Sequence, residues 1–401
     1  GVATIIQTVG YGKIGSRLPI IQGTSFAFIP VMAPFAKAGL GAVFTAAFIG
    51  GIFQIWIGKM LKPIRHMFPP LVTGIVVLMI GVSLLGVGFQ YAGGGAWLLN
   101  NKPDIYANGS HLFLAFTVLI VTVLVHQYSK GFLGSASILI GMAVGYVIAI
   151  PMGMIQFSKI ANASWFALPM PLQYGIDFVP GAIILMLFMA VVTTIETIGD
   201  ISATTMGGAN REATDEELSG GILADGLGTA FGSLFNAMPN TSYSQNAGLV
   251  AFSGVISRHV GTIAGIILVL FGLFPKLGGI IAAMPESILG GAAIVMFGLI
   301  TAAGIKLISQ SDLNKRNLLI LGLSLSFGIG LYLKPEFVSH FPDLGIKLPL
   351  LLTTGLIPTG LLAFILNVIL PKEKKILLLN ASYEAFFQLT LPKKVFLAFS
   401  D

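Results

Sequence analysis

The stretch Gly291-Ala-Ala-Ile-Val-Met-Phe-Gly298 repeats the pattern of an earlier stretch, Gly74-Ile-Val-Val-Leu-Met-Ile-Gly81. The two copies lie 217 residues apart, and the same offset brings Thr24-Ser-Phe-Ala27 onto Thr241-Ser-Tyr-Ser244. An odd number of predicted membrane crossings separates the copies, so they run through the bilayer in opposite directions. This pattern predicts an all-α polytopic membrane protein built from an inverted repeat, a common plan of secondary transporters.

The composition supports a membrane location. Of the 401 residues, 55% are hydrophobic and only 9% are charged, and the mean hydropathy is +0.91. A soluble domain carries roughly 25% charged residues, so this chain has too few to cover a water-facing surface. The net charge of +6 does not indicate nucleic acid as a partner, because basic residues stand singly between apolar runs. The expected surrounding partner is the lipid bilayer.

Apolar runs separated by short polar loops follow one another along the chain. They predict crossings at 1–12, 18–37, 39–58, 68–90, 111–128, 132–153, 179–206, 218–236, 240–256, 260–275, 287–308, 316–333 and 349–371. If the loops alternate sides, 16 of the 22 Lys and Arg residues fall on one side. Basic residues accumulate on the cytoplasmic side. We therefore expect the first loop and the tail in the cytoplasm, and the protein in a bacterial inner membrane or plasma membrane.

The repeat offset also predicts where the first copy of the repeat should begin. The second copy begins near Val179, so the offset places the start of the first copy before residue 1. We expect that the N-terminal span of the first repeat is missing from this chain. We also expect that a protein starting at Gly1 does not transport, because polar cavity-lining groups would then face lipid.

Three acidic residues lie inside predicted crossings. Glu196 and Asp200 share one helix face, because they are four residues apart, and Asp225 lies early in the next crossing. Ionisable groups in lipid cost about 2.5–3.5 kcal/mol by insertion scales and are functional by default. The alternatives are a structural pair held by Ser or Thr hydroxyls and, for Asp225, a partner of a helix N-terminus. Because close carboxylates repel, Asp200 and Asp225 are candidates for cation coupling, alone or with Glu196.

Two segments interrupt their crossings. Pro19 and Pro30 bracket Gln22–Phe28, and Pro239 precedes the polar segment Asn240–Gln245. Non-helical backbone at membrane depth must line a cavity or lie buried in protein. The half-helices that follow would aim their N-termini at the gap, which favours polar or anionic ligand groups. The alternative is a Pro-kinked helix with no ligand role.

Nothing in the sequence indicates an enzyme. The five His residues fall at crossing ends or in loops, no His pair has metal-site spacing, and there is no Cys. No nucleophile triad can be assembled. We therefore expect no catalytic residues, no metal and no cofactor.

The stretch from Gln245 to Gly254 resembles the signature of the nucleobase–ascorbate transporter family. That signature reads Gln, Glu or Pro, then Asn-x-Gly, four further residues, Thr, and Arg, Lys or Gly. Asn246 and Gly248 match it, and Ser253 stands where the family has Thr, which keeps the hydroxyl.

Three further motifs, in the family's order, carry the same resemblance. Gln22–Phe28 resembles the family's earlier broken crossing, and Glu196-Thr-Ile-Gly-Asp200 and Ala224-Asp225-Gly226 resemble its acidic sites. The resemblance covers nearly the whole chain and is closest to xanthine and uric acid permeases.

The resemblance implies fourteen crossings in two inverted repeats of seven, with two broken crossings that contain short strands. It also implies core and gate domains and usually a homodimer. The expected parts are the core part of the first repeat (1–90), its gate part (91–178), the core part of the second repeat (179–308), its gate part (309–371) and a cytoplasmic tail (372–401).

The resemblance places a substrate between the two broken crossings. Glu196 matches the acid that binds the edge of the base, and Gln245 matches the position that contacts the ring. A carboxylate accepts from two ring N–H groups, and a Gln amide both donates and accepts. Backbone N–H groups near Phe26 and Ser244 would meet ring carbonyls, and Tyr243 or Phe26 would stack on the ring. The expected substrate-binding set is Glu196, Gln245, Phe26, Ser25, Tyr243 and Ser244.

Gln at position 245 and Asp at position 200 favour purines, because uracil permeases tend to carry Glu and His there. The resemblance thus implies import of xanthine or uric acid coupled to a cation, which we expect to be a proton. The alternatives are a uracil or ascorbate symporter of the same family. An alternative of another class is an inorganic anion exchanger or channel of the same fold, which a carboxylate facing the site disfavours.

Overall fold

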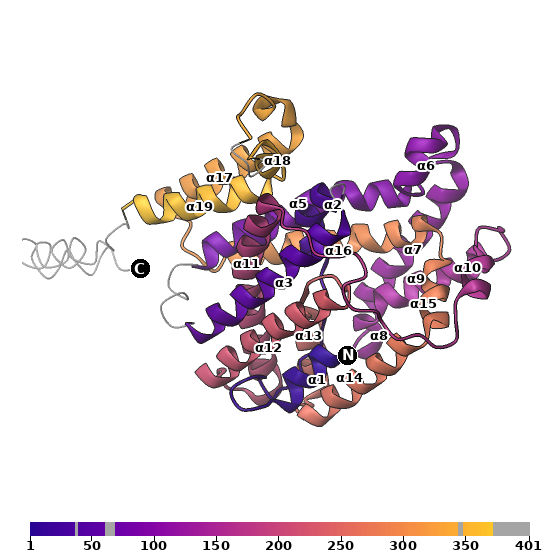
Figure 1. Ribbon diagram of the computed structural model, residues 1–401, viewed down its shortest axis with the longest axis horizontal. Helices are drawn as coiled ribbons and strands as arrows, with labels where there is room; N and C mark the ends of the chain where they lie inside the picture. The colour runs from indigo at the N-terminus through magenta and orange to yellow at the C-terminus, as the bar shows by residue number, and fades with distance from the viewer. Residues whose placement is uncertain (37–38, 61–68, 344–347, 372–401) are drawn as a thin grey trace, which may run out of the picture.

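The computed structural model describes residues 1–36, 39–60, 69–343 and 348–371; the predicted tail, 372–401, lies outside them. The described chain is almost entirely helical (Figure 1). Its longer helices are α1 (Val2–Val9), α2 (Ile29–Ala36), α3 (Leu40–Lys59), α5 (Pro70–Ala92), α7 (Gly109–Tyr128), α9 (Ser137–Ala149), α11 (Pro180–Ala209), α12 (Asp215–Leu234), α13 (Ser244–Ser253), α14 (Arg258–Leu273), α15 (Pro275–Ala282), α16 (Glu286–Ile308), α17 (Lys315–Leu333) and α19 (Leu356–Ile369).

Shorter elements connect these helices. They are β1 (Gln22–Thr24), β2 (Asn240–Ser242), the 3-10 helices η1 (Phe26–Phe28), η2 (Pro103–Ile105) and η3 (Pro335–Val338), and the helices α6 (Gly95–Asn101), α8 (Phe132–Ser135), α10 (Phe157–Asn162) and α18 (Leu348–Thr353). The predicted crossings match the other long helices but miss α15, α6 and α10, which lack an apolar run of spanning length.

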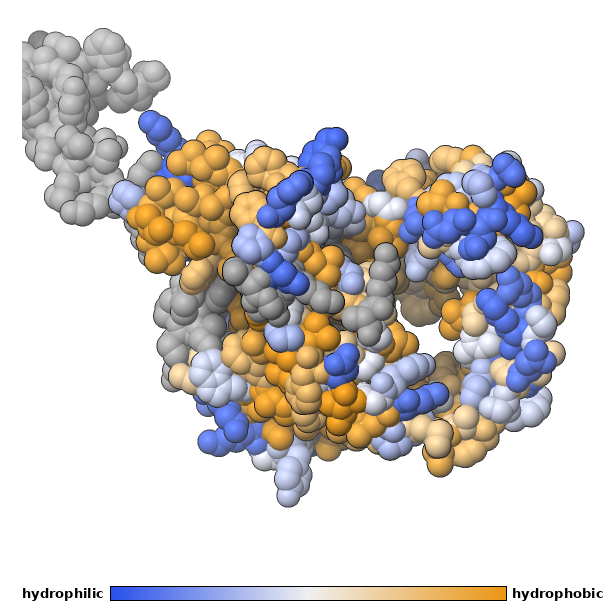
Figure 2. Space-filling view, turned by 45° about the horizontal axis from the view of Figure 1, so that its top comes forward, coloured by the Kyte–Doolittle hydropathy of each residue, from blue (hydrophilic) through white to orange (hydrophobic). Residues whose placement is uncertain are grey.

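Six described helices are long and apolar enough to cross a membrane: α3, α5, α7, α11, α16 and α17. The pair α14 and α15, bent by 80°, would add a seventh crossing. Hydrophobic side chains cover broad areas of the surface, and hydrophilic ones gather in separate patches (Figure 2). These features confirm a multi-pass membrane protein.

The two short strands confirm the inverted repeat. β1 pairs with β2 in antiparallel register, with Gln22 opposite Ser242 and Thr24 opposite Asn240. The strands are repeat-equivalent, so their antiparallel pairing means that the two copies run in opposite directions. A half-helix follows each strand, η1 with α2 after β1 and α13 after β2. The further helix expected before residue 1 stays a prediction.

The helices that carry the two quoted stretches, α5 and α16, make the most extensive helix contact of the described chain. Gly74 and Gly81 lie seven residues apart on one face of α5, and both touch α16. A Cβ atom at Gly81 would lie 2.6 Å from the backbone nitrogen of Thr301, and one at Gly304 would lie 2.4 Å from that of Leu78. The backbones therefore touch, as small residues allow in membrane helices.

Helix packing divides the described chain into two groups. One group, α1, α3, α11, α12, α13 and α14, surrounds the two strands. In the other, α5 and α16 run between the α7–α9 pair and the α17–α19 pair (Figure 1). A cluster of buried side chains that includes Phe35, Met189 and Phe297 fills the contact between the groups. The domain boundaries at residues 90, 178 and 308 stay a prediction.

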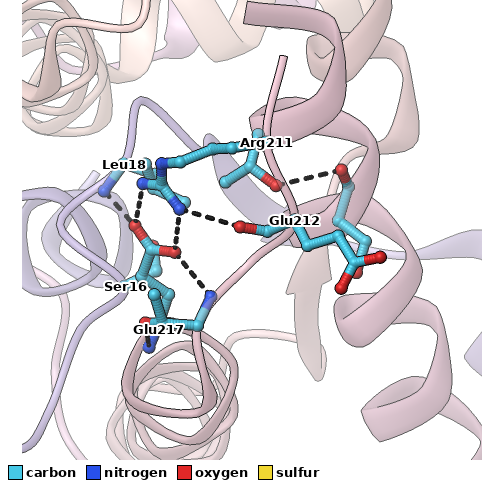
Figure 3. Close-up of polar contacts among 8 residues, drawn as sticks. Ser16, Leu18, Arg211, Glu212 and Glu217 are labelled. Atoms are coloured by element: carbon cyan, nitrogen blue, oxygen red, sulfur yellow. Dashed lines mark hydrogen bonds and ion pairs between the residues drawn. The ribbon is translucent and has the colours of Figure 1, made fainter. Parts of the chain in front are cut away.

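The turn between α11 and α12 orients the helices that carry all three acids. Asn210 ends α11 in the left-handed conformation, with φ of 50°. Thr214 and Glu217 form a capping box at the start of α12. The Arg211 guanidinium donates two hydrogen bonds to the Glu217 carboxylate, of 2.8 and 2.5 Å (Figure 3). These bonds from the Arg211 guanidinium hold the pKa of Glu217 below its ordinary value.

We predict that Gly304→Ala destabilises the α5–α16 contact. Alanine favours a helix over glycine by about 1 kcal/mol, but the added methyl group would clash with the Leu78 backbone, and overpacking costs roughly 1–3 kcal/mol. Gly298→Ala is the matched control, since nothing lies within 4 Å of its Cβ position on the same helix. Thermal unfolding of the purified protein in detergent should give a lower midpoint for Gly304→Ala alone; equal midpoints would contradict the close contact.

We predict a pH-dependent coupling between Arg211 and Glu217. Because the folded-state pKa of Glu217 is depressed, its contribution to stability is present at neutral pH and is lost as the pH falls through that pKa. A double-mutant cycle of Arg211→Gln and Glu217→Gln should show a coupling energy of about 0.5 kcal/mol at pH 7, since the Arg211 side chain is 44% exposed and solvent screens the pair. The coupling should weaken as the pH falls through the depressed pKa of Glu217, and therefore at a lower pH than for an ordinary glutamate. Additive losses at pH 7 would show that the pair contributes nothing.

Candidate functional site

Two equivalent threonine contacts hold the broken crossings. The Thr4 hydroxyl donates to the carbonyl of Gln22 and accepts from its backbone N–H, both at 3.1 Å. The Thr229 hydroxyl makes the same pair of 3.1 Å bonds with Asn240. All four residues are buried. Each copy of the repeat thus satisfies strand backbone that no water can reach at this depth.

The side chains at the first positions of the two strands, Gln22 and Asn240, also meet. The Asn240 Nδ2 donates to Gln22 Oε1 at 3.1 Å across the strand pair. It also donates to Asp225 Oδ1 at 2.8 Å, which ties the strands to α12. Asn240 therefore connects the centre of the inverted repeat to one of the predicted coupling residues.

Asp225 is completely buried and accepts from three side chains. Besides Asn240, Thr197 donates to Oδ2 at 2.7 Å and Gln54 Nε2 donates to Oδ2 at 3.0 Å. Within the described part of the chain, no Lys, Arg or His forms an ion pair with it. Its desolvation is offset by uncharged donors alone, an environment in which gain or loss of a proton rearranges several neighbours.

Gln54 reaches Asp225 because α3 and α12 approach closely. A Cβ atom at Gly51 would lie 2.6 Å from the backbone nitrogen of Ala230, and one at Gly226 would lie 2.7 Å from the carbonyl oxygen of Gly51. Because these glycines have no side chains, the two helix backbones can lie in contact. Asp225 directly precedes Gly226 in the sequence.

Asp200 lies beside this network. Its Oδ2 accepts from the Ser242 hydroxyl at 2.5 Å, and only 6% of the residue is exposed. The Ser242 hydroxyl oxygen in turn lies 3.5 Å from that of Thr197, which is bonded to Asp225. Asp200 and Asp225 are thus linked through two hydroxyl groups.

Glu196 differs from both aspartates. It lies one turn before Asp200 on α11, about 6 Å along the helix axis, and it is partly exposed. Among the described residues, no side chain or backbone group donates a hydrogen bond to its carboxylate. Glu196 therefore keeps its full acceptor capacity for a ligand.

The second broken crossing presents an open helix end. α13 begins at Ser244 after Tyr243, and no side chain caps its N-terminus. Ser244 and Gln245 are exposed there. Within the described chain the Gln245 carboxamide has no hydrogen-bond partner. The Asn246 backbone N–H donates to the Tyr243 carbonyl at 2.9 Å, so the backbone N–H groups of Ser244 and Gln245 are available together with the Gln245 side chain.

The remaining signature residues hold α13 in place. Asn246 Nδ2 donates to the carbonyl of Pro19, just before β1. The Ser253 hydroxyl stays at the end of α13, where it accepts from the backbone N–H of Val255 at 3.3 Å. Gly248 has nothing within 4 Å of its Cβ position. In the described structure Asn246 and Ser253 thus make structural contacts.

The first broken crossing is organised differently. Ser25 caps η1 by accepting from the backbone N–H of Ala27 at 3.2 Å. Phe26 is 40% exposed and packs edge-on against Phe297 of α16, with ring centroids 5.4 Å apart. The Tyr243 hydroxyl donates to the carbonyl of Thr24 at 3.0 Å. Phe26 therefore lies where the two helix groups meet.

Sequence reasoning missed Gln54, Asn240 and Thr197 as hydrogen-bond donors to Asp225. Gln54 is the one amide in the apolar run of α3. A polar side chain inside a crossing is costly in lipid, as for the acids, so this position could have been predicted to be functional. Thr197 lies between the two acids of α11 and has no distinguishing feature in the sequence. The structure links Asp200 and Asp225 through Thr197 and Ser242, with Glu196 one turn away on α11. The assignment of these acids to substrate and cation stays a prediction.

Comparisons with known proteins agree with this architecture. Residues 1–337 match the model of a family described as the Permease family. The xanthine permease of Bacillus subtilis is 37% identical over 383 residues, 94% of this chain and 85% of its own length. Xanthine permease XanP of Escherichia coli is 35% identical over 392 residues, covering 94% and 83%. Uric acid transporter UacT of Escherichia coli is 35% identical over 376 residues, covering 92% and 76%.

Solved structures of the same fold are more distant in sequence. The transmembrane domain of the cyanobacterial bicarbonate transporter BicA aligns with a TM-score of 0.59 at 17% identity, over 91% of this chain and 88% of that one. SLC26A9 aligns with a TM-score of 0.58 at 16% identity, over 90% and 59%. At this identity the likeness shows the fold alone.

Proposed function

Because the chain belongs to the nucleobase–ascorbate family of permeases, we propose that it is a secondary active transporter that imports xanthine or uric acid coupled to protons. The observation that carries this proposal is the Glu196 carboxylate, which lies partly exposed and unbonded beside the crossing of the broken spans. An acid at membrane depth that no protein group satisfies is suited to a ligand that donates hydrogen bonds.

A purine base fits the groups available around Glu196. Its adjacent N–H groups would donate to the carboxylate, and its carbonyl oxygens would accept from the backbone N–H groups of Ser244 and Gln245 at the start of α13. Gln245 would donate and accept at the ring edge. Ser25 and Ser244 would border the base, and Phe26 or Tyr243 would stack on its face.

The two aspartates are suited to carry the coupled cation. Asp225 is surrounded by amide and hydroxyl donors, and Asp200 lies one turn from the substrate acid. The amide N–H groups of Gln54 and Asn240 that point at Asp225 disfavour a metal cation there, because a hard cation requires oxygen ligands that point at it; this leaves a proton as the coupled cation. We therefore assign coupling to Asp200 and Asp225.

Transport would proceed by movement between the two helix groups. The group around the strands would act as the core, and the group with α7, α9, α17 and α19 would act as the gate, with Phe26 and Phe297 at their contact. By its packing, the α5–α16 pair would belong with the gate, so the core boundaries expected at residues 90 and 308 would move to the starts of these two helices. We further propose a homodimer and a cytoplasmic first loop and tail, the latter from the distribution of Lys and Arg.

The competing substrates within the family are uracil and ascorbate. An inorganic anion exchanger or channel of the same fold is the competing function of another class, since BicA transports bicarbonate. The Glu196 carboxylate disfavours a small anion at the same position, because like charges repel.

We predict that Glu196→Gln weakens purine binding at least tenfold. The substituted amide keeps the shape but donates from one of the two atoms that should accept, which leaves a buried donor facing a ring N–H group. Xanthine and urate binding to the purified protein would be measured by calorimetry, with Glu286→Gln on α16 as the control. Wild-type affinity in Glu196→Gln would remove Glu196 from the substrate site.

We predict that Gln245→Glu lowers purine affinity and moves preference toward uracil. The change replaces a group that both donates and accepts by one that only accepts, and it adds a second charge near Glu196. Competition of xanthine, urate and uracil for labelled xanthine measures the preference, with Gln310→Glu as a control away from the crossing. The same competition profile in variant and wild type would count against a role in base choice.

A further inference from the structure

We propose that the hydroxyl groups of Thr197 and Ser242 form a proton relay between Asp225 and Asp200. This inference rests on the proposed proton coupling and adds a route for the proton within it. The relay connects the completely buried acid of α12 with the acid of α11 that lies one turn from the substrate position.

The four groups form an unbroken series. The Thr197 oxygen lies 2.7 Å from Asp225 Oδ2, the Ser242 oxygen lies 3.5 Å from that of Thr197, and Asp200 Oδ2 lies 2.5 Å from Ser242. Thr197 and Asp225 are 0% exposed, and Ser242 is 1% exposed. A hydroxyl group both donates and accepts, so each can pass a proton on without becoming charged at the end of the step.

The transfer balances in atoms and charge. A proton on Asp225 moves to the Thr197 oxygen, the Thr197 proton moves to the Ser242 oxygen, and the Ser242 proton moves to Asp200. One O–H bond breaks at Asp225 and one forms at Asp200, while each hydroxyl loses one proton and gains one. The negative charge moves from Asp200 to Asp225, and no other reactant is needed.

No other described side chain at Asp225 offers such a route. Its other partners, Gln54 and Asn240, are amides, which donate but do not readily take up a proton at nitrogen. The charged groups that act on these acids are the acids themselves, Glu196 and Asp200 on α11 and Asp225 on α12. Within the described chain no basic side chain from α3, α12, α13 or the strands pairs with them.

The central link is also where the relay can be interrupted. At 3.5 Å the Thr197 and Ser242 oxygens lie beyond the usual O–H···O distance of about 2.7–2.8 Å. Thr197 belongs to α11 and Ser242 to β2, so an approach of less than about 1 Å between these two elements closes the link. Proton passage would thereby depend on how the broken crossing sits against α11.

The test uses Thr197→Val, which keeps the shape and removes the hydroxyl, and Thr197→Ser, which restores it. Thr194→Val is the matched control, since Thr194 lies on the same helix, is equally buried and donates only to the carbonyl of Ala190. The full-chain protein in proteoliposomes would be assayed for xanthine exchange, which needs no net proton transfer, and for xanthine accumulation driven by an imposed pH gradient.

We expect Thr197→Val to keep exchange within about threefold of wild type and to lose gradient-driven accumulation at least tenfold, with Thr197→Ser and Thr194→Val near wild type. If Thr197→Val fails to fold, Ser242→Ala takes its place with the same readouts. Gradient-driven accumulation at the wild-type rate in either hydroxyl-free variant would overturn the relay alone. Accumulation by the wild-type protein that ignores the pH gradient would overturn the proposed proton coupling and the relay with it.

Discussion

The pairing of β1 with β2 is the contact on which the rest of the structure depends. Two segments that lack helical hydrogen bonds must be satisfied where no water can reach their backbone. They achieve this with each other, through the antiparallel ladder, and with the Thr4 and Thr229 hydroxyls, one from each copy of the repeat. The same pairing places the start of the α13 half-helix beside α11. The strand pair that satisfies the backbone hydrogen bonds therefore also positions the residues of the candidate site.

Glycine contacts decide which polar side chains can meet. Gly51 and Gly226 let α3 and α12 touch, which brings Gln54 within 3.0 Å of Asp225. Gly207 on α11 likewise faces Ala251 on α13. The buried carboxylates are thus surrounded by neutral donors that helices with larger side chains would hold too far away.

The three acids share one region yet have different surroundings. Asp225 accepts from three donors, Asp200 accepts from Ser242, and Glu196 has no partner among the described residues. This gradation, from fully satisfied to free, runs from the most buried acid toward the partly exposed one. It gives each acid a distinct role in the proposed cycle, the free one toward substrate and the satisfied ones toward the proton.

Much of this could be predicted from the sequence, because both the repeat and the acids leave local signals. The offset between Gly74 and Gly291 predicted which segments correspond, and the odd number of crossings between them predicted that they run in opposite directions. The charge of Glu196 within an apolar run indicated that its helix has a functional role. The Gln54–Asp225 contact joins residues 171 positions apart. It depends on the close packing of α3 against α12, which no local sequence pattern predicts. Thr197 and Ser242 are common residue types whose relation exists only once β2 lies against α11.

The central claim is that purine movement is coupled to proton movement through the buried aspartates. The most direct measurement records the pH inside weakly buffered proteoliposomes while xanthine or urate is added outside in the absence of any imposed gradient. The account predicts that the interior acidifies together with purine uptake. Purine uptake with no accompanying change in internal pH would contradict it.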